Sequence, residues 1–94
     1  MAEISLGIVE TRGYVGLIEA SDAMVKAANV KVIKYEKVGG GRLAIAVVGD
    51  VGAVRVAVEA GVEAGKRSGD VWATVIANPT PDLSKFLSLT GGGE

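Results

Sequence analysis

The sequence predicts a two-layer α/β sandwich in which two helices cover one face of a four-stranded antiparallel sheet. The 94 residues suffice for one hydrophobic core but not for two. Four segments have the composition or alternation of strands, and two longer segments repeat their apolar residues with the period of a helix. These segments follow the order β-α-β-β-α-β along the chain, which is the order of a ferredoxin-like fold.

The first strand is predicted over residues 4–10, where apolar side chains alternate. A short turn at 11–13 then leads into an amphipathic helix over 14–28. Asn29 is expected at the C-cap of this helix, because asparagine tolerates the left-handed conformation. At about 100° per residue, one half of the helix carries the side chains that we expect to face the core: Leu17, Ile18, Ala20, Ser21, Met24, Val25 and Ala28.

The middle of the chain predicts a β-hairpin. Its strands cover residues 30–38 and 43–48, and the three consecutive glycines Gly39, Gly40 and Gly41 lie between them. The second strand is uninterrupted apolar sequence, whereas a strand of an antiparallel sheet with one face in water should alternate. A monomer would leave an apolar face of the sheet exposed, so we predict an obligate oligomer.

The second helix is predicted over residues 51–67. Asp50 is expected to be its N-cap, because a carboxylate can accept hydrogen bonds from the free amides of the first turn. The small residues Ala57, Gly61 and Gly65 share the inner face of this helix. They indicate that the helix packs very closely against the sheet.

The segments after this helix are shorter. A fourth strand is predicted over 71–77, and the two prolines that follow it end the strand. Beyond them we expect a short helix over 82–89 and a disordered tail over 90–94. The whole chain, 1–94, is predicted to be a single domain with its core in 4–80.

The composition argues against several classes of protein. Without cysteine or histidine, the chain lacks thiolate chemistry, the common transition-metal ligands and the usual general base at neutral pH. We therefore expect no catalytic site, no metal and no cofactor. A net charge of −1 argues against a nucleic-acid partner. With no apolar run of about 18 residues and no signal-peptide pattern, we expect no membrane span and a cytosolic location.

The glycine cluster is the first candidate site. Glycine tolerates positive φ and has no Cβ, so three glycines in a row form a tight turn with bare backbone amides. A nucleotide-binding loop requires a helix after the glycines, but here a strand follows, which argues against that interpretation. Two interpretations then remain level: an ordinary hairpin turn, or a backbone-lined aperture or anion site.

Lys26 is the second candidate. Asp22 lies four residues before it on the predicted helix, an arrangement typical of a solvated ion pair that contributes only about 0.2–0.5 kcal/mol. Taken alone, this pattern favours an ordinary surface lysine. Glu19, Asp22 and Lys26 together could supply an acid, a base and an electrophile, but an exposed helix face does not shield them from water as catalysis requires.

Four segments of the sequence resemble the shell proteins of bacterial microcompartments. They are LGIVETRG at 6–13, IEASDAMVKAA at 18–28, YEKVGGG at 35–41 and GDVGAV at 49–54. The resemblance covers about residues 4–80 in order, and its motifs are long and specific. It points to the single-domain, hexamer-forming class found in carboxysomes and in propanediol, ethanolamine and related metabolosomes.

The resemblance implies a role for the glycine cluster. In the family, a ferredoxin-like domain closes into a flat cyclic hexamer, and the loop that matches Lys37, Val38, Gly39, Gly40 and Gly41 lines a pore on the sixfold axis. Gly40 falls at the narrowest point. A rim without a side chain there should be wide, and its amides should favour small polar or anionic metabolites. The resemblance also implies a non-enzymatic protein in the bacterial cytoplasm, in a shell that encloses enzymes.

The resemblance gives Lys26 a role as well. It matches a lysine that lies against its twofold mate between neighbouring hexamers, with Asn29 nearby. Many relatives also have an arginine that reaches across this edge, at the position where this chain has Asn78. Edge contacts are therefore expected to be weaker, or differently angled, than in those relatives. The partners that the resemblance implies are other hexamers and the trimeric and pentameric tiles of a shell.

A second class of function shares the predicted fold. A regulatory domain could have the same order of elements and sense a small metabolite at a subunit interface. Its ligand should stabilise it saturably, whereas a shell pore should bind its metabolites weakly. Ligand-induced stabilisation therefore separates the two classes.

Overall fold

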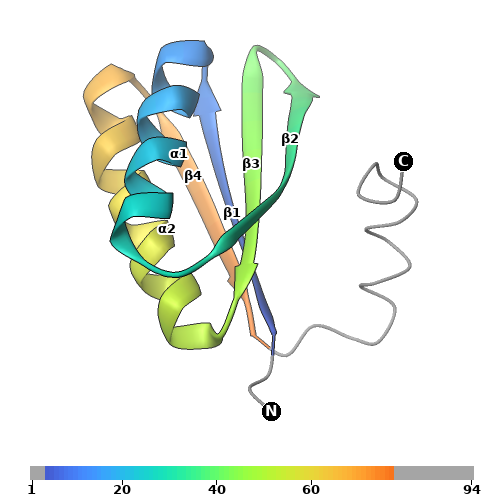
Figure 1. Cartoon of the computed structure of the whole chain (residues 1–94). Helices are drawn as coiled ribbons and strands as arrows, with labels where there is room; N and C mark the ends of the chain where they lie inside the picture. Colours follow the sequence, from blue (N-terminus) through green and yellow to red (C-terminus); the bar gives the residue numbers. More distant parts are fainter. Residues whose placement is uncertain (1–3, 78–94) are drawn as a thin grey trace.

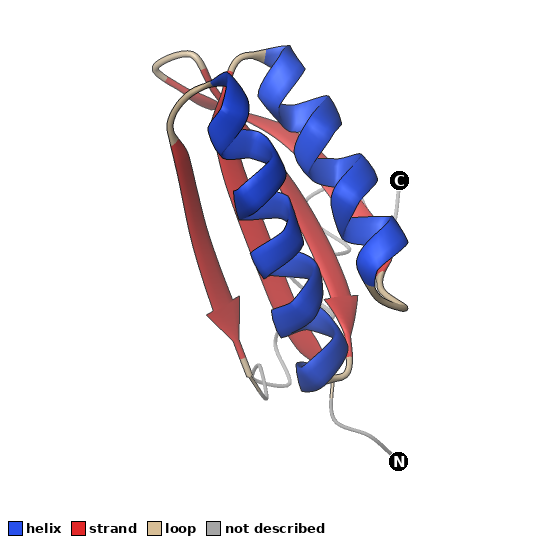
Figure 2. Ribbon diagram, turned by 90° about the vertical axis from the view of Figure 1, so that its left-hand side faces the viewer, coloured by secondary structure: helices blue, strands red, loops and turns tan. Residues whose placement is uncertain are grey.

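The structure, a computed structural model, describes residues 4–77 and has two layers (Figure 1). Its elements are β1 (Ser5–Arg12), α1 (Tyr14–Ala27), β2 (Lys31–Gly39), β3 (Arg42–Gly49), α2 (Val51–Gly65), the 3₁₀ helix η1 (Lys66–Ser68) and β4 (Val71–Ile76). The strands form one antiparallel sheet in the order β2-β3-β1-β4. Both helices lie side by side on one face of this sheet (Figure 2). The predicted fold and its order of elements are confirmed.

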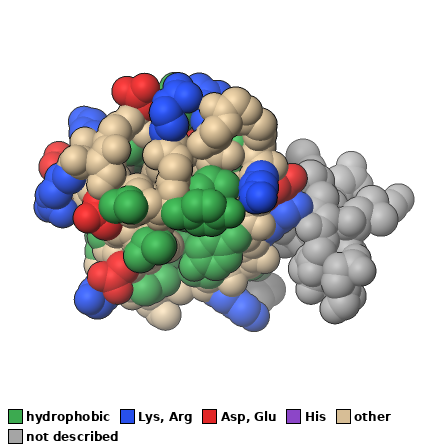
Figure 3. Space-filling view, turned by 90° about the horizontal axis from the view of Figure 1, so that it is seen from above, with side chains coloured by type: hydrophobic (Ala, Val, Ile, Leu, Met, Phe, Trp, Pro, Cys, Tyr) green, Lys and Arg blue, Asp and Glu red, His purple; other side chains and the backbone are tan. Residues whose placement is uncertain are grey.

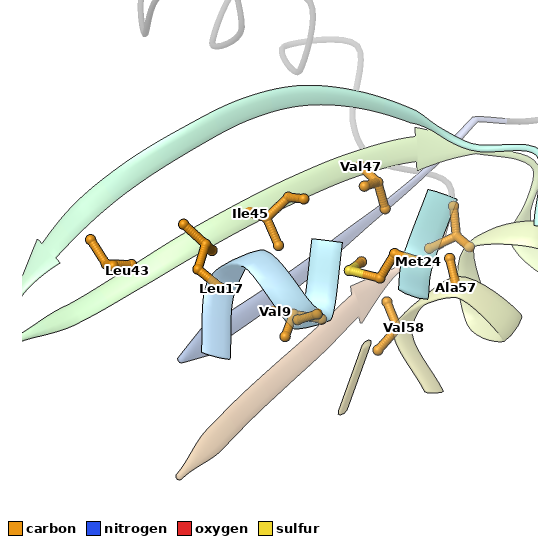
Figure 4. Packing of buried hydrophobic residues seen from close by; sticks show 10 residues of the cluster. Val9, Leu17, Met24, Leu43, Ile45, Val47, Ala57 and Val58 are labelled. Atoms are coloured by element: carbon orange, nitrogen blue, oxygen red, sulfur yellow. The ribbon is translucent and has the colours of Figure 1, made fainter. Parts of the chain in front are cut away.

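The core lies between the sheet and the two helices. Leu43, Ile45 and Val47 alternate along β3 and are buried on its helix side. They pack in one cluster with Met24 of α1 and Val58 of α2 (Figure 4). Burial of this apolar surface is the main force that holds the two layers together.

One glycine allows a helix to approach the sheet closely, and another allows the two helices to approach each other. A Cβ added at Gly7 of β1 would lie 2.7 Å from Val54 Cγ1 and 2.7 Å from Val58 Cγ2. A Cβ added at Gly61 of α2 would lie 2.7 Å from Met24 Cγ. Carbon atoms do not pack at such distances, so a Cβ at either position would force its neighbours to move. The predicted close packing of α2 is confirmed, and it involves α1 as well as the sheet.

β1 is longer than predicted, because it continues to Arg12 instead of ending at residue 10. Thr11 stays paired with β3, is only 1% exposed, and donates a hydrogen bond from Oγ1 to the carbonyl of Gly13 at 3.2 Å. The turn predicted at 11–13 is therefore a single residue, Gly13. Its φ of 89° lies in the region that favours glycine.

Two predictions about α1 are wrong. Its C-cap is Ala28 and not Asn29, since the extended backbone of Ala28 ends the helix and leads the chain towards β2. Ile18 and Val25, expected in the core, are 64% and 47% exposed. The reason is that α1 touches the sheet and α2 along a narrow stripe and not over half of its surface. The buried residues of this stripe are Gly16, Leu17, Ala20 and Met24.

α2 begins as predicted. Asp50 Oδ1 accepts a hydrogen bond from the backbone N–H of Ala53 at 3.0 Å, which confirms the N-cap. The α-helix ends at Gly65, two residues earlier than predicted, and η1 continues the chain towards β4.

β4 ends at Ile76, one residue before the predicted end of the strand. Three further predictions lie outside the residues that the structure describes. They concern the helix over 82–89, the tail over 90–94 and the edge residue Asn78.

The face of the sheet that the helices leave open is apolar in its middle and charged at one end. Leu6 and Ala44 lie on this face and are 5% and 8% exposed. Beside them is a pocket of about 140 Å³, which Glu10 and Lys34 also line. The apolar residues predicted on this face are present, but Leu6 and Ala44 are buried, so less apolar surface is exposed there than expected.

Candidate functional site

The glycine loop is a two-residue hairpin turn formed by Gly40 and Gly41. The strands reach it directly, since Gly39 at the end of β2 pairs with Arg42 at the start of β3. The φ angles of Gly39, Gly40 and Gly41 are 91°, 63° and 80°. Positive φ at both central positions is typical of the turns whose twist matches the flanking strands. A Cβ added at any of the three would meet no atom of residues 4–77 within 4 Å, so glycine is needed here for conformation and not for packing against the described chain.

The loop turns its carbonyls inward to the protein. Arg12 Nη1 donates a hydrogen bond to the carbonyl of Gly40 at 3.2 Å, and the backbone N–H of Gly13 donates to the carbonyl of Gly41 at 3.2 Å. Within residues 4–77, the N–H groups of Gly40 and Gly41 donate to no group. The loop therefore offers hydrogen-bond donors to its surroundings, and few acceptors.

Lys37 and Val38 precede the loop on β2, and they line different surfaces. Lys37 borders a shallow depression that Tyr14 also lines, at the first turn of α1. Val38 borders the apolar pocket on the open face of the sheet and is 45% exposed. This end of the molecule, seen along its axis in Figure 3, carries a hydrophobic patch flanked by charged side chains. The five residues predicted to line a pore lie together at this end.

Lys26 lies at the other end of α1, far from the glycine loop (Figure 1). Its Nζ is 3.0 Å from Asp22 Oδ2, and both side chains are mostly in solvent. Asn29 follows the helix and is exposed. The predicted i to i+4 pair is confirmed, and the two predicted edge residues that the structure describes are accessible on the surface.

The structure assembles no catalytic group from the acidic residues of α1. Glu19 accepts a hydrogen bond from Ser68 Oγ at 2.7 Å, whereas Asp22 pairs with Lys26. Across residues 4–77, no three side chains of the kinds that bind metals lie close enough to share an ion. In the same part of the chain, no helix is long and apolar enough to cross a membrane.

A cluster that the sequence patterns did not reveal lies at the charged end of the open face. Arg12 of β1 and Arg42 of β3 are directly opposite in the ladder. The guanidinium carbon of Arg42 is 3.6 Å from the ring centroid of Trp72, and that of Arg12 is 5.6 Å from it. Arg42 Nη1 also lies 3.7 Å from Glu10 Oε1. These contacts depend on strand register, which the spacing along the chain does not give.

The family model described as the BMC domain matches residues 5–79, which include every element of the described fold. The chain belongs to the BMC-domain family. The bacterial microcompartment shell protein PduA of Citrobacter freundii is 49% identical over 88 residues, which are 93% of this chain and 95% of that protein. The carboxysome shell protein CcmK2 of Thermosynechococcus vestitus is 46% identical over 89 residues, covering 92% of this chain and 87% of that one.

Solved structures show the same BMC fold in longer chains. The crystal structure of a microcompartment protein from Desulfitobacterium hafniense gives a TM-score of 0.82 at 34% identity. It covers 94% of this chain, which in turn spans about half (48%) of that chain. The trimeric bacterial microcompartment shell protein PduB gives a TM-score of 0.56 at 25% identity, covering 92% of this chain and 32% of that one. The resemblance to shell proteins seen in the sequence is confirmed.

Substitution of Gly40 should show that the BMC domain holds this loop at positive φ. Gly40→Val is expected to lower the free energy of unfolding by about 1–2 kcal/mol, because an L-residue with a Cβ is strained in that region. Gly40→Asn should lower the free energy of unfolding by less, since asparagine tolerates positive φ. Urea denaturation at equal protein concentrations measures both. Equal stability of the valine variant and the native protein would contradict the loop conformation.

Proposed function

We propose that this BMC-domain protein is a structural tile of a microcompartment shell in the bacterial cytoplasm, and that it works as a cyclic homo-hexamer without catalysis of its own. The observation that carries the proposal is the match of residues 5–79 to the BMC domain, with shell proteins at 49% and 46% identity over nearly the whole chain. The poor catalytic inventory of the chain agrees with a structural role.

The surface beside the glycine loop supports association around that loop. Tyr14, Val15 and Ile18 of α1 are 60%, 63% and 64% exposed. Large apolar side chains gathered on a surface commonly mark contacts with other proteins. In the proposed hexamer, this surface adjoins a neighbouring subunit and brings six glycine loops towards the sixfold axis.

The proposed pore is lined by Lys37, Val38, Gly39, Gly40 and Gly41, with Gly40 at its narrowest point. No side chain narrows the ring at that position, so its width is set by backbone atoms. The N–H groups of Gly40 and Gly41 have no acceptor within residues 4–77, and small polar or anionic metabolites are the solutes that a ring of such donors suits.

The proposed lateral contacts lie at Lys26 and Asn29, at the end of the molecule remote from the pore. Their exposure leaves them available to a neighbouring hexamer. Asn78 belongs to the same proposed edge, where it replaces a longer arginine and should weaken or re-angle the contact. Trimeric and pentameric tiles complete the proposed shell, which encloses enzymes.

The oligomeric state tests the proposal directly. Native mass spectrometry and sedimentation velocity at micromolar concentration should give a hexamer, and negative-stain images should show sixfold rings. A monomer or a dimer under these conditions would rule out the proposed tile.

Thermal melting separates the tile from a small-ligand regulatory domain. The relatives named above are shell proteins, which does not favour that alternative. Metabolites of microcompartment pathways at millimolar concentration should leave the melting temperature unchanged. A saturable rise with one of them would favour the regulatory domain, because a ligand that binds the folded state stabilises it.

A further inference from the structure

Arg12 connects the glycine loop to the body of the sheet. Its Nη1 donates to the carbonyl of Gly40 at 3.2 Å, across 28 positions of sequence. Its Nε lies 3.7 Å from Asp70 Oδ2, and its guanidinium group lies 5.6 Å from the ring centroid of Trp72. One side chain thus links the turn between β2 and β3 to the segment at the start of β4.

Arg42 is the natural comparison for Arg12. It lies directly opposite Arg12 in the β1–β3 ladder, carries the same charge, and is closer to Trp72, at 3.6 Å. Its ion-pair partner is Glu10, and within residues 4–77 it donates no hydrogen bond to a carbonyl of the loop. The cluster contains two guanidinium groups and two carboxylates, so its charges balance. What distinguishes Arg12 is its bond to the loop and not an excess of positive charge.

The bond from Arg12 fixes the orientation of one peptide group. The Gly40–Gly41 peptide is planar and trans, so its carbonyl and the N–H of Gly41 point in opposite directions. With glycine on both sides, this peptide can rotate at little steric cost, because glycine accepts positive and negative φ. A rotated peptide would present a carbonyl where the loop now presents an N–H. The loop would then offer an acceptor, which suits a cation and not an anion.

We propose that Arg12 is a positioning residue that determines the solute preference of the glycine loop. It holds the Gly40 carbonyl towards β1 and thereby keeps the N–H of Gly41 free for an anionic solute such as a carboxylate or a phosphate. This inference rests on the proposed function, since the loop meets solutes only if it lines a passage. The orientation of the Gly40–Gly41 peptide, in contrast, depends only on contacts within a single protomer.

Two substitutions that each remove one positive charge test the proposal in the full-length protein. Arg12→Gln removes the bond to the loop, and Arg42→Gln removes the same charge from the same cluster without touching the loop. Inorganic phosphate is titrated into ¹⁵N-labelled protein, and the shifts of the Gly40 and Gly41 amide signals are followed. We expect Arg12→Gln to weaken phosphate binding roughly tenfold. The rotated peptide would lose the hydrogen bond from the Gly41 N–H to the phosphate, and a hydrogen bond to a charged group contributes about that much. Arg42→Gln should change it less than about twofold.

The outcomes distinguish a positioning role of Arg12 from a mere effect of its charge. They also distinguish failure of this inference from failure of the proposed function. An equal loss in both variants would mean that charge alone acts and would overturn the proposal. Unchanged backbone dihedrals of Gly40 and Gly41 in Arg12→Gln, from chemical shifts, would overturn it too. If that variant does not fold, the scalar coupling across the hydrogen bond from Arg12 to the Gly40 carbonyl is sought in the native protein, and its absence contradicts the proposal. A native protein that is not hexameric would instead contradict the proposed function, whatever the peptide does.

Discussion

Gly7→Ala is expected to lower the free energy of unfolding by about 1–3 kcal/mol, the usual cost of an extra methyl group in a packed core. The new Cβ would lie 2.7 Å from one methyl carbon of Val54 and 2.7 Å from one of Val58. Valine is stiff at χ1, so neither methyl group can rotate away cheaply. α2 must therefore move off the sheet. For a domain of this size, 1 kcal/mol shifts the melting temperature by roughly 4–8 °C.

Two other glycines give this prediction its controls. Gly61→Ala also places a Cβ at 2.7 Å from its neighbour, but that neighbour is Met24, whose unbranched chain adapts more easily. Gly61→Ala should therefore lower the free energy of unfolding by less than Gly7→Ala does. Among residues 4–77, an added Cβ at Gly52, in the first turn of α2, would have only Asp50 Oδ1 near it, at 3.7 Å. Gly52→Ala should be neutral or stabilising, by up to about 1 kcal/mol. If Gly7→Ala were no worse than Gly52→Ala, the close packing of the layers would be wrong.

Lys26→Asp is expected to abolish lateral assembly of hexamers while the protomer stays folded and the hexamer stays intact. The fold loses little, because the exposed pair with Asp22 contributes only about 0.2–0.5 kcal/mol. The proposed edge contact is destabilised much more. Across its twofold axis, the carboxylates introduced at position 26 of two neighbouring subunits would face and repel each other, each with Asp22 beside it. Negative-stain microscopy and pelleting of assembled sheets measure lateral growth, and sedimentation velocity measures the hexamer.

The partner of Lys26 provides the matched control. Asp22→Asn breaks the same ion pair but keeps the lysine, so sheets should still form. Sheets that persist unchanged in Lys26→Asp would refute the edge role of the lysine. Loss of sheets in both variants would assign the effect to the local ion pair and not to a contact of Lys26 with a neighbour.

The fold could be predicted from the sequence wherever local chemistry decides it. Asp50 before an amphipathic run is sufficient to place the start of α2, because an N-cap acts only on the adjacent turn. The periodicities of 2 and 3.6 are likewise local. The core face of α1 was predicted too broadly, and Ile18 and Val25 proved exposed. How wide a stripe a helix buries depends on its neighbours in space, which periodicity does not specify.

In the candidate site, too, the local features could be predicted from the sequence and the long-range contacts could not. Three glycines after a strand predict a turn at positive φ, and the pair formed by Asp22 and Lys26 follows from helical spacing. The contact of Arg12 with Gly40 could not be predicted, because it spans 28 positions and requires β1 to continue beyond its predicted end. That extension comes from pairing with β3, a long-range interaction.

The length of α1 separates the two proposed functional regions. The helix has 14 residues, which at 1.5 Å per residue makes it about 21 Å long. The glycine loop lies at its first turn and Lys26 at its last. Substitutions farther apart than about 7–10 Å usually have additive effects on free energy. We therefore expect the proposed aperture and the proposed edge to vary independently, so that substitutions could change what the proposed tile admits without changing how it joins its neighbours.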